Sequence, residues 1–399
     1  METSEARKSF RVNLVVVTLV LVSFLGYSLG GFSSTLLVDL ARTFKVTVGT
    51  LSQLEIINLT MGLVVGFVMG FLALKFKYKS IYLVGIALFA VGTIGFFFSQ
   101  SFFVFLLWHF VLGVGSAMFG IIGLTLVGEF IPLKRRGWVM GLMTSSIWVA
   151  FVVVGPLSGI IDSLAGWRAV LLWFILPCSL LCFGLSFVSI PSKQLQELPP
   201  IRPSYSQAFQ QVFLNKSAIA CVVANALSGF LAILGLYGVS FYRISFNISP
   251  LMGGAFAAVA FGGGIFGGLV GGRSVNRVGR KYISVLGYLI AGALGIIFTF
   301  VPDAWFSLGL WSALEFCVAM GLAGALSLTI EQVPGSRASM MSVNYALTEI
   351  GWISALIIGG LVLNLYLDNF HLLMTILGAG GVAAGLIFLF LTKDTCKIS

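Results

Sequence analysis

The chain has 399 residues, of which 59% are hydrophobic and only 9% are charged. A soluble globular domain carries roughly 25% charged residues, so this chain lacks the ions to cover a water-facing surface of its size. Its net charge of +10 does not indicate nucleic-acid binding, because the Lys and Arg residues form short clusters between apolar runs. The composition therefore predicts an integral membrane protein.

Twelve apolar runs are long enough to cross a bilayer, which takes about 20 helical residues. The first run is too long for the apolar region of a signal peptide, and eleven more follow, so we interpret it as a retained helix. We therefore predict an all-α membrane fold of twelve transmembrane helices. They are Leu14–Leu37, Val48–Ala73, Ile81–Phe98, Phe102–Val127, Trp138–Ile161, Ala169–Ile190, Ala218–Phe241, Leu251–Val270, Tyr282–Phe300, Ala304–Ile330, Ala338–Leu363 and Leu372–Leu391.

The distribution of basic residues predicts the orientation of these helices. With the N-terminus inside, 19 of the 23 Lys and Arg residues fall on the inner side, and only Arg42, Lys45, Arg168 and Arg243 fall outside. A missed helix would invert every later loop and destroy this asymmetry. We expect a multi-pass protein of the cell membrane with both termini in the cytoplasm.

A polar, proline-containing stretch, Pro191–Lys216, divides the twelve helices into six and six. We predict an N-terminal six-helix bundle over residues 1–190, a cytoplasmic linker over 191–216 and a C-terminal six-helix bundle over 217–399. The second part of the linker, Ser204–Lys216, is either a plain tether or a short interfacial helix.

The two halves resemble each other at one fixed offset of 202 residues. Because six helices is an even number, both halves have the same orientation, and an axis along the membrane normal would relate them. In such proteins the binding site lies between the halves, near the middle of the bilayer. The matching pairs are Phe44–Thr47 with Phe246–Ser249, Gly70–Lys79 with Gly272–Lys281, and Glu129–Arg135 with Glu331–Arg337.

The segment Gly272–Lys281, with its Asn276-Arg277 and Gly279-Arg280-Lys281, resembles the loop signature of the major facilitator superfamily. In that family the loop between the second and third helices of a half is a conformational latch. The family has Asp where Asn276 stands, and the N-terminal copy is degraded, so an Asp-based latch is not expected in either half. The latch residues that the resemblance implies are Gly70, Lys75, Lys79, Gly272, Asn276, Arg277, Gly279, Arg280 and Lys281.

Two further segments carry the same resemblance. His109 stands where a helix-four pattern of the superfamily has Arg, followed by Gly113 and Gly115. Gly155-Pro156-Leu-Ser-Gly159 in the fifth helix is similar to the signature of drug/proton antiporters. That signature ends in two glycines, and here the pair is incomplete because Ile160 follows Gly159. A Gly-Pro pair also removes a backbone hydrogen bond and thins the helix, which favours a kink and close packing. The alternative role of all these motifs is packing and orientation without substrate contact.

Ionisable side chains inside the predicted spans are costly and usually face a functional cavity. Glu315 and Glu349 lie near the middle of the tenth and eleventh helices, and Glu55 and His109 lie closer to the outer ends. Burial disfavours a charged carboxylate, so such a Glu can take up and release a proton. Alternatively, Glu349 is hydrogen-bonded between helices and Glu55 reaches the outer surface. The candidate proton-coupling and cavity residues are Glu315, Glu349, His109, Glu55, Asn225 and Asn344.

These features favour a secondary transporter that works by alternating access, with proton-coupled efflux of lipophilic, cationic or neutral small molecules as the leading hypothesis. The alternatives are a proton-coupled importer of a small metabolite and a non-transporting membrane sensor on the same scaffold. We expect no enzyme, because no nucleophile, base and orienting group form a set. No phosphate-binding loop motif occurs, and with two His residues a His-built metal site is not expected, so neither cofactor nor metal is predicted. The expected partners are a small-molecule substrate, protons and the bilayer, with the chain acting as a monomer.

Overall fold

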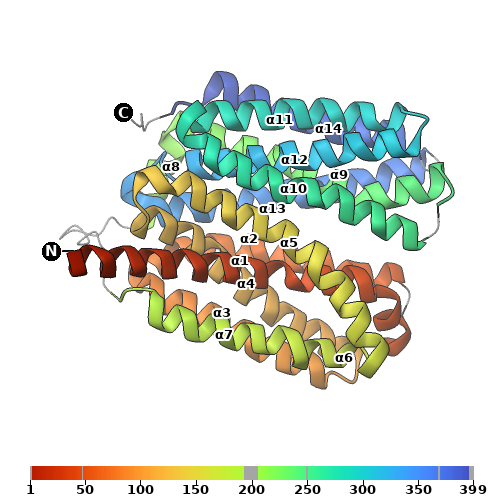
Figure 1. Cartoon of the computed structure of the whole chain (residues 1–399), viewed down its shortest axis with the longest axis horizontal. Helices are drawn as coiled ribbons and strands as arrows, with labels where there is room; N and C mark the ends of the chain where they lie inside the picture. The colour runs from red at the N-terminus through yellow and green to blue at the C-terminus, as the bar shows by residue number, and fades with distance from the viewer. Residues whose placement is uncertain (1, 47, 193–204, 249, 367–368, 395–399) are drawn as a thin grey trace. The chain divides into compact units, whose positions relative to one another are not determined.

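The computed structural model describes residues 2–46, 48–192, 205–248, 250–366 and 369–394, and for some of these, such as 2–11, 48–56 and 205–208, it describes the backbone alone. Within the described residues all regular structure is helical (Figure 1). Lipid cannot hydrogen-bond the backbone, so a spanning segment satisfies its own N–H and C=O groups by forming a helix. The all-α architecture therefore follows from the apolar runs.

The first half of the chain forms long helices that follow the predicted runs. Its last spanning segment is a continuous series in which α6 and α7 are joined by the π-helical turn η1. Pro177 begins the turn after η1 and has no N–H to donate, which favours the wider π spacing at this point. The helices are α1 (Glu2–Phe44), α2 (Val48–Lys75), α3 (Tyr78–Phe98), α4 (Phe102–Phe130), α5 (Leu133–Ala165), α6 (Trp167–Val170), η1 (Leu171–Ile175) and α7 (Leu176–Ser189).

The second half begins with a short helix in the predicted linker and continues with six long ones. These are α8 (Tyr205–Leu214), α9 (Lys216–Ser245), α10 (Pro250–Val278), α11 (Arg280–Ile297), α12 (Ala304–Thr329), α13 (Arg337–Leu365) and α14 (Phe370–Leu391), with the short turns η2 (Phe298–Phe300) and η3 (Pro334–Ser336). The segment predicted as a tether or an interfacial helix is thus helical, and Val212 on it is buried against Val222 and Val343. The rest of that linker, 193–204, lies outside the described residues.

Eleven of the described helices are long and apolar enough to cross a membrane. The remaining predicted span, Val48–Ala73, coincides with α2, whose described apolar stretch Leu59–Lys75 is shorter. The main difference from the prediction is the length of α1, which extends beyond both ends of the predicted Leu14–Leu37. Helix formation continues past an apolar run because its polar flanks can stay helical in water.

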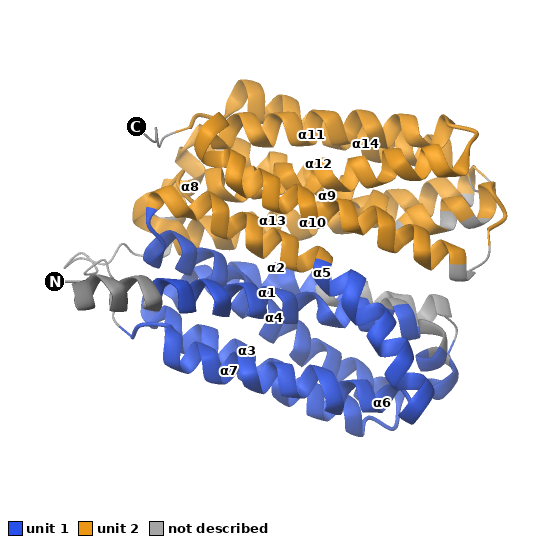
Figure 2. Cartoon of the chain, viewed as in Figure 1, with its two compact units in different colours: residues 1–132, 149–208 blue, residues 133–148, 209–399 orange. Residues whose placement is uncertain are grey.

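The chain groups into two compact units by its internal contacts (Figure 2). Unit 1 contains residues 1–132 and 149–208, and unit 2 contains 133–148 and 209–399. This grouping differs from the predicted bundles mainly in α5, whose first half, 133–148, belongs to unit 2. The predicted boundaries at 190 and 217 stay predictions.

Glycines permit the close helix contacts within unit 2. A Cβ built at Gly267 or Gly271 of α10 would lie 2.0 Å and 2.7 Å from backbone atoms of Phe316 and Met320 on α12. On the other side of α10, Gly272 would clash in the same way with Gly141 of α5. Helices in lipid associate largely through close backbone packing, which only small residues allow. The glycine-rich stretch Phe261–Gly272 is therefore a packing surface.

Candidate functional site

Glu315 lies in the middle of α12 and only 1% of it is exposed. The indole N–H of Trp311, one turn earlier on the same helix face, donates a hydrogen bond of 3.0 Å to Oε1 of this carboxyl group. The second oxygen, Oε2, has no hydrogen-bond partner among the described residues. The carboxyl group is therefore held at one oxygen only.

A series of aromatic rings extends from the indole that binds this carboxyl group. The ring of Trp311 stacks on Tyr242 of α9 with 5.5 Å between centroids, and it meets Phe261 of α10 edge-on at 5.9 Å. Phe261 in turn stacks on Trp148 of α5 at 5.7 Å, and the buried indole nitrogen of Trp148 has no partner among the described residues. Such rings can hold a planar or cationic molecule through stacking and cation–π attraction.

Two glycines of α9 leave space for the side chains of Trp311 and Glu315. A Cβ built at Gly235 would lie 2.6 Å from Oε1 of Glu315, and one built at Gly238 would lie 2.4 Å from the Trp311 ring. Any larger residue at either place would displace the carboxyl group or the indole. The spacing of three residues places both glycines on the same face of α9, next to α12.

The charge around Glu315 is sparse. The Lys and Arg residues of unit 2 whose side chains are described lie near helix ends, as the sequence predicted; they include Arg273, Arg277, Arg280, Lys281 and Arg337. Desolvation disfavours an ionised carboxyl group that lacks a cation partner. Chemically, such a group can hold a proton, release it, or exchange it for a cationic or hydrogen-bond-donating molecule.

Two of the predicted cavity residues meet in a second polar cluster. The side-chain amide of Asn225 on α9 donates to Oδ1 of Asn344 on α13 at 2.6 Å and to the hydroxyl of Thr329 on α12 at 3.0 Å. All three side chains are buried. The cluster joins three helices, and its contacts are those of an interhelical hydrogen-bond network.

The remaining predicted titratable residues are placed differently. His109 on α4 is 5% exposed, lies 5.8 Å from the ring of Phe96, and has no hydrogen-bond partner for either ring nitrogen among the described residues. Glu349 is half-buried, midway along α13. The side chain of Glu55, on α2, lies outside the described residues.

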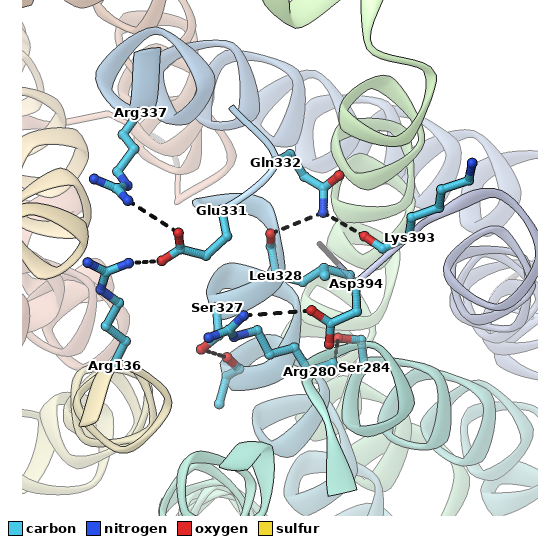
Figure 3. A network of polar contacts seen from close by, with 11 residues as sticks. Arg136, Arg280, Ser284, Ser327, Leu328, Glu331, Gln332, Arg337, Lys393 and Asp394 are labelled. Atoms are coloured by element: carbon cyan, nitrogen blue, oxygen red, sulfur yellow. Dashed lines mark hydrogen bonds and ion pairs between the residues drawn. The ribbon is translucent and has the colours of Figure 1, made fainter. Parts of the chain in front are cut away.

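A third polar cluster lies at the end of α12. The distribution of basic residues predicts that this end faces the inner side of the membrane. Glu331, only 2% exposed, accepts hydrogen bonds from two arginines, Arg136 of α5 at Oε1 and Arg337 of α13 at Oε2 (Figure 3). Charge-assisted pairs of this kind are strong when water is excluded. Glu331 therefore ties the starts of α5 and α13 to the end of α12.

The C-terminal segment after α14 joins the same region. Asp394 lies 3.6 Å from the guanidinium of Arg280, which is 1% exposed, and the backbone carbonyl of Lys393 accepts from the side chain of Gln332 at 3.0 Å (Figure 3). Lys281 donates to the carbonyl of Thr392 at 2.8 Å. Through this bond the Lys281 ammonium lies at the C-terminal end of α14, the negative end of that helix dipole.

The contacts of the predicted latch loops follow the internal repeat. Lys79 donates to the carbonyl of Phe187 at the end of α7, as its counterpart Lys281, 202 positions later, does at the end of α14. The amide of Asn276 donates to the carbonyl of Lys134 at the start of α5. An Asp at this position could not donate in that way, so the sequence departure changes the chemistry of the loop.

The other latch residues have simpler roles. Gly279 has φ of +99°, a conformation that favours glycine, and it begins the turn into α11. Gly272 lies against Gly141, as described above. Gly70 is buried, Lys75 lies over the ring of Phe71 and Arg277 is exposed.

The helix-five motif packs as the Gly-Pro pair predicts. A Cβ at Gly155 would lie 3.0 Å from the hydroxyl of Thr35 on α1, and Gly159 faces the methyl group of the same threonine at 3.8 Å. Pro156 is inside α5 and is exposed. The motif thus brings α1 and the second half of α5 together within unit 1.

Several residues of these sites are not among those predicted from the sequence. Glu331 and Arg337 belong to the third repeat pair, in which a Glu is followed six residues later by an Arg in each half. This repeated spacing is the sequence feature that could have identified them. Trp311 is one turn from Glu315, so its position was also visible. Arg136, Tyr242, Phe261 and Thr329 carried no signal, because their contacts depend on which helices pack together.

The fold and these sites define a multi-pass membrane protein with a buried carboxyl group within unit 2. The family model of the Major Facilitator Superfamily matches residues 17–304 and 239–397. The chain belongs to this superfamily, which is a family of secondary transporters and not of enzymes.

Solved structures confirm the fold. The fucose:proton symporter FucP of E. coli superposes with a TM-score of 0.78, covering 95% of this chain and 98% of that one at 15% identity. The proton:xylose symporter XylE superposes with a TM-score of 0.79 over 97% of each chain, again at 15% identity. The predicted all-α membrane fold of twelve helices is confirmed.

The curated relatives are distant and diverse. The cis,cis-muconate transport protein of Acinetobacter baylyi is 25% identical over 61% of this chain and 60% of its own. The quinolone resistance transporter of Acinetobacter baumannii is 27% identical over 45% of this chain and 46% of its own. The purine ribonucleoside efflux pump NepI of Shigella dysenteriae is 22% identical over 66% of this chain and 70% of its own. The matches to the first two thus span less than two thirds of those proteins.

Proposed function

We propose that the protein is a proton-coupled exporter of lipophilic, cationic or neutral small molecules, and that Glu315 carries the proton. The observation that carries this proposal is the buried carboxyl group of Glu315, which has one oxygen without a partner among the described residues. A cation would pair with this group and displace its proton, so the two would compete for one site. Competition of that kind produces antiport.

The surroundings of Glu315 support the substrate class. The aromatic rings of Trp311, Phe261 and Trp148 favour planar or cationic molecules, and the Lys and Arg residues of the described part of unit 2 lie near helix ends. Relatives named for quinolone resistance and purine ribonucleoside efflux also support export of small aromatic molecules. The relative named for cis,cis-muconate, a carboxylate, supports the competing hypothesis of an importer.

Substrate charge separates these two hypotheses. A buried anion normally needs a fixed cation, so we expect saturable transport of lipophilic cations or neutral amphiphiles, and none of phosphate, sulfate, nitrate or dicarboxylates. Uptake of labelled compounds into proteoliposomes is measured at about pH 5.5 and about pH 8, on either side of the usual His pKa.

Among the described residues, His109 is the one deep group that could replace the missing cation when protonated. Saturable anion transport that is lost in His109→Ala would contradict export of cations and favour the importer. His371→Ala is the matched control, because His371 is exposed at the start of α14.

A sensor, the third hypothesis, would move no compound under any gradient. We further propose that the monomer transports, which activity in vesicles holding a single chain would test.

The orientation is also a proposal: both termini lie in the cytoplasm, and the membrane is the cell membrane. Single cysteines are placed at the exposed positions Lys77 and Pro302 in a background without the native cysteines. In intact cells an impermeant thiol reagent is expected to label position 302 but not 77, which should react only after the membrane is opened. The reverse pattern would show that the termini face outward.

We also propose that the contacts of the inner helix ends act as the conformational latch. Glu331 binds two arginines, and Asn276 binds the start of α5, so these contacts hold the first half of α5 within unit 2. Alternating access requires contacts that form in one state and break in another.

A further inference from the structure

The two oxygens of Glu315 have unlike surroundings. Oε1 accepts the indole N–H of Trp311 at 3.0 Å and faces Gly235, while Oε2 has no partner among the described residues. A carboxyl group can otherwise rotate and exchange its oxygens. The single hydrogen bond to the indole therefore distinguishes the oxygen that is held from the oxygen that is available.

The indole that makes this bond is itself fixed. Trp311 is fully buried, and its ring stacks on Tyr242 and lies against Gly238, both on α9. The hydroxyl of Ser307 donates to the carbonyl of Phe298 at 2.9 Å. Its only proton is thus used, so the phenol of Tyr242, 2.7 Å away, donates to Ser307. A continuous series of contacts, from η2 through Ser307 of α12 to Tyr242 of α9, fixes the position of the Trp311 ring.

We propose that Trp311 is the positioning residue of Glu315: its N–H holds Oε1, so that Oε2 is the oxygen that exchanges the proton or meets a donor group of the substrate. This inference rests on the proposed function, because it assigns a task to the same carboxyl group. It adds a residue that fixes which atom of that group reacts and how firmly the proton is held.

The other ionisable groups near the pair are few. Among described side chains, α9 brings the phenols of Tyr237 and Tyr242, α11 brings the phenol of Tyr288, and α12 itself carries Cys317. Glu349 lies on α13, and the cations Arg273 and Arg277 lie at the far end of α10. None of these is a cation at the depth of Glu315. The N–H of Trp311 is therefore the main donor that stabilises the ionised form.

The first test replaces Trp311 by Phe, which keeps a ring and removes the N–H. Protonation of Glu315 is followed by infrared difference spectroscopy as a function of pH, using the carbonyl band of the protonated carboxyl group that disappears in Glu315→Gln. Loss of a charge-assisted hydrogen bond disfavours the ionised form, so we expect the midpoint to move upward by about one to two pH units. The band should also move to higher frequency, because its carbonyl loses a donor.

Trp305→Phe is the matched control for this variant. Trp305 lies on the same helix, is 65% exposed, and does not contact Glu315 in the structure. We expect the Trp305→Phe midpoint and band to match those of the wild type. The pH at half-maximal transport should move in Trp311→Phe in the same direction as the spectroscopic midpoint.

A second variant tests the same geometry without changing either partner. In Gly235→Ala the added methyl group would lie 2.6 Å from Oε1 of Glu315, so the carboxyl group must move away from the indole. We expect an upward shift of the midpoint, as in Trp311→Phe. Gly309→Ala on α12 is the control, since a Cβ there meets no atom within 4 Å. This variant keeps the test valid if Trp311→Phe does not fold.

An unchanged midpoint and band in Trp311→Phe, or in Gly235→Ala if the former is not folded, would overturn the positioning role. A shift in both variants with neither control affected would support it. If Glu315→Gln transports normally while Trp311→Phe still shifts the Glu315 band, the proton-carrying role fails and the positioning of the carboxyl group stands. The two ideas therefore fail in distinguishable ways.

Discussion

Glu315→Gln is expected to reduce proton-driven transport to the background of empty liposomes. Glutamine keeps the size of the side chain and can still accept the indole N–H of Trp311, but it cannot bind and release a proton. The helix packing should therefore survive, because the substitution removes no volume from this buried position. Substrate accumulation driven by an imposed pH gradient in proteoliposomes is the measurement.

Counterflow separates loss of coupling from loss of binding. Exchange of labelled for unlabelled substrate needs no net proton movement, so it should persist in Glu315→Gln when the substrate is neutral. Glu349→Gln is the matched comparison, with a half-buried carboxyl group midway along α13. Wild-type rates and wild-type pH dependence in Glu315→Gln would transfer the coupling role to Glu349, Glu55 or His109.

Glu331→Gln is expected to lower the free energy of unfolding by about 3 kcal/mol, the lower end of what breaking a buried ion pair costs. The substitution leaves Arg136 and Arg337 next to an uncharged group in a place where the carboxylate is 2% exposed. Two desolvated cations that lose their anion repel each other as well. Thermal unfolding of the purified protein in detergent gives the comparison with the wild type.

Two other acidic residues provide a graded control for burial. Asp394→Asn removes the partner of Arg280, where the carboxylate is 27% exposed, so a smaller loss is expected. Asp39→Asn removes an i,i+3 partner of Arg42 at the surface, where such pairs contribute roughly 0.2–0.5 kcal/mol. Equal stability of all three variants would mean that Glu331 is not a structural centre of the inner helix ends.

The latch proposal adds a functional expectation to the same variant. If the contacts of Glu331 hold the first half of α5 within unit 2, their loss should change the balance between transport states. Accessibility of a single cysteine at position 145 of α5 is the readout, since Ser145 is buried with its hydroxyl bonded to the carbonyl of Ile265 on α10, and cysteine is close to serine in size. The single-cysteine protein that keeps Glu331 is the control. If Glu331→Gln does not label this position faster than the control, the latch proposal is contradicted.

The sequence by itself determined the class of the protein, its helices and the depth of its carboxyl groups. The bilayer imposes these features directly, because a span must be apolar, helical and about 20 residues long. The length of the apolar run around Glu315 was therefore enough to place this residue correctly at the middle of its helix. Lys79 and Lys281, which the repeat offset pairs, also make equivalent contacts in the structure.

The tertiary structure alone decided which partners these residues have. Asn225 meets Asn344 across 119 positions of sequence, and Arg136 meets Glu331 across 195. Periodicity shows which residues share one face of a helix, but not which helix that face meets. In lipid no difference in hydrophobicity drives the choice, so close glycine contacts select the neighbours. Gly235 and Gly238 were unremarkable in sequence, and their missing side chains are what bring α9 against Trp311 and Glu315.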